Sequence, residues 1–182
     1  MQRKSFVKGV LGVSAVAGLL GTGGRGEAQE NAAAGAEKKL AAKNTFLNGW
    51  LTAWLTGMKK DLPEAEKVLV IEDNGRACAE RGGSLTWARS FQGNLDKLLT
   101  EMRTQIGEKN VVRDGNTVRL TYEQCFCPLV GDLPGKLPDD FCLCTRGWTK
   151  AVYGAITGKP VDVILKSTIK RGDPACIIEV KL

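Results

Sequence analysis

Hydrophobic positions recur every three to four residues in four stretches of this chain, and this spacing predicts four amphipathic helices. They cover residues 46–58, 63–78, 95–106 and 145–157, and glycines follow the last three. In the first helix, large apolar side chains recur at 46, 47, 50, 51, 54, 55 and 58. Trp50 and Trp54 belong to that stripe, so we expect them in the core, although they could also form the base of a ligand pocket.

After residue 107 the apolar period changes from 3.6 to 2, which indicates strands. Val111 and Val112 precede an Asp-Gly-Asn turn, and alternating apolar residues follow it at 118, 120 and 122, as in a β-hairpin. A second hairpin is predicted from alternation over 161–165 and 176–182, around an Arg-Gly-Asp-Pro turn. Helices followed by hairpin, helix and hairpin predict an α+β domain, with the helices packed on an antiparallel sheet.

The first 28 residues have the composition of an export signal. A basic start, Arg3-Lys4-Ser5-Phe6-Val7-Lys8, precedes a short run rich in Gly and Ala, which is too short for a stable membrane anchor. The basic segment resembles the twin-arginine consensus with Lys4 in place of the second arginine, so both the twin-arginine and the Sec route stay open. We therefore expect recognition by the export machinery and a periplasmic or extracellular location.

Three segments follow from this pattern: an export signal at 1–28, a helical or flexible lead-in at 29–43, and one domain at 44–182. Cleavage after Ala28 would remove four basic residues and one acid, which lowers the formal charge from +6 to about +3. The remaining basic residues are interspersed with acids, so the sequence does not favour nucleic acid binding.

Six cysteines provide the main candidate chemistry. Four of them form two Cys-x-Cys pairs, Cys125/Cys127 and Cys142/Cys144, and the others are Cys78 and Cys176. Thiolates at such spacing suit a soft metal, which predicts zinc or an iron–sulfur cluster. We expect the metal ligands among these six residues.

Two other interpretations of the cysteines stay open. Six cysteines in an exported protein could form three disulfides, with 15 connectivities, or one pair could exchange thiols with a partner. The chain has no histidine, the commonest general base, so a cysteine nucleophile would depend on carboxylates.

The C-terminal region resembles the vinyl-reductase-like family of small-molecule-binding domains. The resemblance rests on Cys144, Gly147-Trp148, Thr157-Gly158-Lys159-Pro160-Val161 and Gly172-Asp173-Pro174-Ala175-Cys176. It implies a metal site built from cysteines and an acid, beside a pocket for a small, often apolar ligand. Tyr122, Trp148, Tyr153 and Arg146 are candidates for that pocket.

The chain departs from this family where a Glu-x-x-Cys is usual, because Leu165 and Thr168 occupy those positions. The final Gly-Asp-x-x-Cys is also similar to the aminothiazoline-carboxylate hydrolase-like family. Three functions therefore remain: an exported thiolate metal-binding domain that could bind or sense a small ligand, a hydrolase-like enzyme, and a disulfide-stapled structural module.

Overall fold

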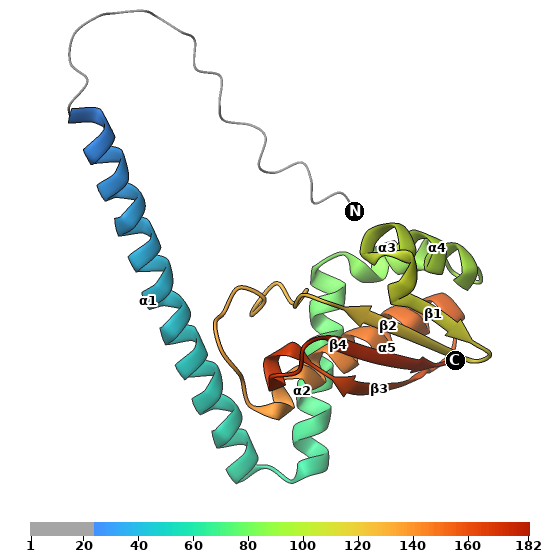
Figure 1. The fold of residues 1–182 in the computed structure, drawn as a ribbon. Coiled ribbons are helices and arrows are strands. Elements are labelled where there is room, and N and C mark those ends of the chain that lie inside the picture. The colour runs from blue at the N-terminus through green and yellow to red at the C-terminus, as the bar shows by residue number, and fades with distance from the viewer. Residues whose placement is uncertain (1–23) are drawn as a thin grey trace, which may run out of the picture. The chain divides into compact units, whose positions relative to one another are not determined.

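The computed structural model describes residues 24–182 (Figure 1). Two compact units are distinguished, and their described parts are residues 24–43 and 44–182. The predicted export signal lies outside the described residues, apart from 24–28 at the start of helix α1 (Gly24–Asp61). Among the described residues, no helix has the length and apolar character needed to cross a membrane.

The second unit confirms the predicted α+β class. After the last part of α1 it contains four helices and three short 3₁₀ turns. The helices are α2 (Glu64–Arg81), α3 (Ser84–Arg89), α4 (Leu95–Ile106) and α5 (Leu143–Thr157), and the turns are η1 (Glu108–Asn110), η2 (Asp139–Cys142) and η3 (Ile169–Arg171). The short helix α3 was not predicted, because six residues are too few to display a helical period.

Four strands form one antiparallel sheet in the order β1-β2-β4-β3. Their bounds are β1 (Val111–Asp114), β2 (Thr117–Tyr122), β3 (Asp162–Ser167) and β4 (Cys176–Lys181). Both predicted hairpins are present, and β2 pairs with β4 to join them. The register places Tyr122 opposite Cys176, so one end of the β2–β4 pair lies at the cysteine-rich loops.

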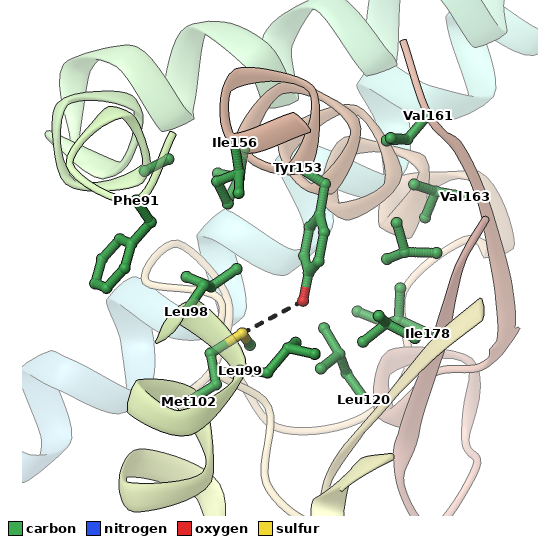
Figure 2. Packing of buried hydrophobic residues seen from close by; sticks show 14 of the residues in the cluster. Phe91, Leu98, Leu99, Met102, Leu120, Tyr153, Ile156, Val161, Val163 and Ile178 are labelled. Carbon is green, nitrogen blue, oxygen red and sulfur yellow. Dashed lines mark hydrogen bonds between the residues drawn. The ribbon is translucent and has the colours of Figure 1, made fainter. Parts of the chain in front are cut away.

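The main core lies between the sheet and helices α3, α4 and α5 (Figure 2). Alternate residues of the strands point into it, including Val118 and Leu120 on β2 and Ile178 and Val180 on β4. Tyr153 of α5 lies in this core, where its hydroxyl donates to the Met102 sulfur at 3.3 Å (Figure 2). Burial raises the pKa of Tyr153, so its hydroxyl stays protonated.

The 44–61 segment of α1 has two apolar faces instead of the single face predicted. Leu55 is 2% exposed and belongs to a second cluster with Ile71 and Phe141. Trp50 is 54% exposed and stacks on the exposed Trp54, with ring centroids 6.2 Å apart. The prediction that the two tryptophans pack in the core is therefore wrong. Each lies one residue before Leu51 or Leu55, so it is rotated about 100° around the helix from the buried stripe.

Candidate functional site

All six cysteines gather at one end of the sheet, from four separate parts of the chain. Cys78 is on α2, Cys125 and Cys127 follow β2, Cys142 and Cys144 lie at the start of α5, and Cys176 begins β4. Burial is the largest cause of the raised pKa of Cys144 and Cys176, and nearby cysteines raise it further: Cys127, Cys78 and Cys142 act on Cys144, and Cys125 and Cys127 act on Cys176. The structure thus brings together every cysteine that the sequence proposed as a ligand.

Four of these cysteines line one small cavity, and we refer to Cys125, Cys127, Cys142 and Cys176 as the cavity cysteines. Its volume is about 10 Å³, which is space for about one water-sized sphere. Such a cavity suits a single ion and is too small for an organic ligand. Cys78 and Cys144 do not line it.

Helices α2 and α5 cross at two glycines, and this crossing positions Cys78 and Cys144. A Cβ atom on Gly75 would lie 1.9 Å from the Cys144 carbonyl oxygen, and one on Gly147 would lie 2.0 Å from the Glu72 carbonyl oxygen. Only glycine permits this approach, because both obstructions are backbone atoms. Since Cys78 is one turn beyond Gly75, the close crossing places it beside Cys144.

The loop after β2 folds its backbone around Cys127. The N–H groups of Leu129 and Val130 point at the Cys127 sulfur and act to lower its pKa, although burial outweighs them and raises the pKa overall. Gly131 closes this turn with a 2.8 Å hydrogen bond to the Cys127 carbonyl. Backbone donors aimed at sulfur favour a thiolate over a thiol, as in metal sites.

Turn η3 supplies further donors to the same cavity. The Ile169 N–H donates to the Cys176 sulfur at 3.4 Å. Thr168 and Lys170 also line the cavity and are buried. The Thr168 hydroxyl acts to lower the pKa of the Cys142 thiol, yet it meets no partner in hydrogen-bonding geometry among the described residues.

In the absence of a cation, burial favours the protonated thiol at four of the six cysteines. Burial is the largest cause of the raised pKa of Cys127, Cys142, Cys144 and Cys176, and it brings Cys144 to about 12. A helix N-terminus generally favours a thiolate, but at Cys144, which lies at the start of α5, burial dominates and raises the pKa. A free cysteine nucleophile needs a lowered pKa, so these thiols are poorly suited to that role.

The predicted pocket residues separate into different environments. Tyr153 is in the main core, whereas Tyr122 lines a surface groove of about 340 Å³ together with Phe126 and Cys125. The ring centroids of Tyr122 and Phe126 lie 4.3 Å apart, and those of Phe126 and Trp148 lie 6.2 Å apart. The groove adjoins the cavity, because Phe126 and Cys125 line both.

Arg146 pairs with Glu72, and Lys150 pairs with the same carboxylate at 2.9 Å. Arg146 does not line the cavity. The cations at the cysteines are instead Lys170, which lines the cavity, and Arg171, which acts to lower the pKa of Cys142. The sequence analysis did not propose Lys170 or Arg171 as site residues, because Lys170 lies between the two predicted strands and Arg171 in the predicted turn. Thr168 was noted only because it occupies the position of the cysteine in the vinyl-reductase-like family, and that position was the available signal for this segment.

The cysteines are all free thiols in this structure. Within residues 24–182, no three Cys, Asp or Glu side chains already have the arrangement that would hold a metal ion. A metal bound in the cavity would therefore require the thiol groups to turn toward a common centre.

Residues 86–182 match the model of a family of unknown function (DUF6144). The matched region includes the four cavity cysteines and η3, but not Cys78. No curated protein matches the chain.

Proposed function

Because the chain belongs to the family of unknown function DUF6144, we propose a function from its own residues: it binds one transition-metal ion through the cavity cysteines. The observation that carries this proposal is their convergence. Three distant segments bring four sulfurs to an ion-sized cavity, where backbone N–H groups point at two of them. Four thiolates are a common ligand set of structural zinc sites.

Zinc fits this cavity better than an iron–sulfur cluster does. It accepts four thiolates in a tetrahedral arrangement, and the cavity volume of about 10 Å³ leaves little room for a multi-iron cluster. A bound zinc ion would stabilise the thiolates over the thiols and would tie the loop after β2 to α5 and β4. A closed site of this kind would serve folding and stability.

The resemblance noted in the sequence is compatible with this location. Leu165 and Thr168, at the positions where the vinyl-reductase-like family usually carries its Glu and Cys, both line the cavity. We propose that the chain forms its metal site in the corresponding place with a different ligand set. A small ligand, if bound, would occupy the neighbouring groove at Tyr122, and export would place the domain outside the cytoplasm.

Elemental analysis of the full chain, purified under reducing conditions without chelator, tests the metal proposal. We expect about one zinc per chain, and free thiols for all six cysteines on denaturation after the metal is removed. The variants Cys127→Ser and Cys176→Ser should lose the metal. Cys78→Ser, which removes a cysteine outside the cavity lining, should keep it.

Other results would replace the proposal with a different one. Iron together with inorganic sulfide would assign a cluster to the same cysteines. Absence of metal after reconstitution with zinc, iron and sulfide would refute a metal site. Protein isolated without reductant that lacks metal and free thiols would indicate three disulfides and a stapled module.

A further inference from the structure

The chain buries two lysines among its described residues, and only one of them has a carboxylate partner. Lys67 is 1% exposed, and its ammonium contacts Glu64 and Asp140, the latter at 2.9 Å. Lys170 is 5% exposed, and its ammonium contacts the Leu133 carbonyl and, at 3.5 Å, the Gly131 carbonyl. No carboxylate in the described part of the chain pairs with it.

A buried ammonium without a counter-charge is costly, because two carbonyl dipoles do not replace an anion. Lys170 lines the same cavity as the cavity cysteines. Thiolates formed in that cavity would supply the counter-charge that Lys170 lacks.

The two residues before Lys170 also carry hydrogen-bond donors at the cavity. Thr168 is 2% exposed, and its hydroxyl lacks a hydrogen-bond partner among the described residues. Since a buried hydroxyl without a partner is destabilising, its position in the cavity lining points to an acceptor there. With the Ile169 N–H on Cys176, residues 168–170 present three hydrogen-bond donors to this region.

We propose that Lys170 and Thr168 form the outer shell of the metal centre, in which Lys170 compensates its negative charge and Thr168 donates a hydrogen bond to the Cys142 thiolate. This inference rests on the proposed function. A divalent ion with four thiolates carries a net charge of −2, and Lys170 reduces it to −1. Lys170 would thus lower the electrostatic cost of burying four thiolates around one divalent ion.

Zinc affinity of the full chain, measured by competition with a chromophoric chelator in reductant, tests this inference. Lys170→Met should weaken zinc binding about 10- to 100-fold, the range typical of outer-shell changes. Lys170→Arg, which keeps the charge, should recover most of the affinity. Lys166→Met, which removes an exposed lysine of β3 about 3.7 Å from Glu179, is the matched control and should bind zinc normally.

Thr168→Val separates an outer-shell role from a structural one, and it also serves if Lys170→Met does not fold. The metal-free variant should be as stable as the parent or more stable, because it loses a buried hydroxyl without a partner. Its zinc affinity should nevertheless fall about 10-fold. Cobalt(II) bound in place of zinc should keep its thiolate charge-transfer bands, which shows that the ligands themselves are unchanged.

The outcomes distinguish the two proposals. If the parent chain binds no zinc in reductant, the zinc centre fails and the outer shell fails with it. If the parent binds zinc and both Lys170→Met and Thr168→Val bind it equally well, only the outer shell is refuted. Lower stability of metal-free Thr168→Val with unchanged zinc affinity would assign Thr168 a packing role instead.

Discussion

The crossing of α2 and α5 provides the sharpest test of how this fold builds its site. Gly75→Ala would place a Cβ atom 1.9 Å from the Cys144 carbonyl oxygen and 2.8 Å from the Trp148 backbone nitrogen. Ordinary contact begins near 3.4 Å, so the helices would have to separate by about 1.5 Å at this point. No rotamer change relieves the overlap, because the obstructing atoms belong to the backbone.

Two opposing contributions determine how much Gly75→Ala changes the free energy of unfolding. Overpacking costs about 3 kcal/mol at the upper end of the usual range, whereas alanine in a helix gains about 1 kcal/mol over glycine. We therefore expect Gly75→Ala to lower the free energy of unfolding by about 2 kcal/mol. In a chain of this size, that corresponds to a fall in Tm of roughly 4–8 °C.

Urea and thermal unfolding followed by circular dichroism would measure this effect. Gly49→Ala is the matched control, because Gly49 is also helical and nothing lies within 4 Å of its added Cβ. The control should be unchanged or slightly stabilised, by up to about 1 kcal/mol. Equal stability of Gly75→Ala and Gly49→Ala would refute the close crossing.

Two further changes test the packing of α1 and the start of α4. Leu55→Ala should lower the free energy of unfolding in urea by about 2–4 kcal/mol, because Leu55 is buried in the second cluster. Trp50→Ala should lower it by less than about 1 kcal/mol, because the Trp50 ring is largely exposed. The reverse order of the two effects would contradict the two apolar faces of α1. Asn94→Ala should lower the free energy of unfolding by about 1 kcal/mol, because the Asn94 side chain caps α4 by accepting a hydrogen bond from the Lys97 N–H at 3.1 Å. An unchanged urea midpoint would show that this cap contributes little to stability.

Local order in the chain was largely predictable from the sequence. The third predicted helix, 95–106, matches α4 to the residue, because a strong apolar stripe ends at Gly107, whose positive φ of 98° terminates it. Both hairpins were predicted because alternation and turn residues act over short distances. The cysteine spacing likewise identified the residues that now lie together.

Tertiary structure alone decided the remaining features. The sequence does not show which of two adjacent apolar stripes on α1 meets the core, so the exposure of Trp50 and Trp54 depends on where the rest of the domain packs. It also does not reveal that Lys170 is buried without a carboxylate, since burial and pairing arise from loops far apart in the chain. Six cysteines could be counted from the sequence, but the separation of the cavity cysteines from Cys78 and Cys144 follows from how α2, α5 and the sheet meet in space.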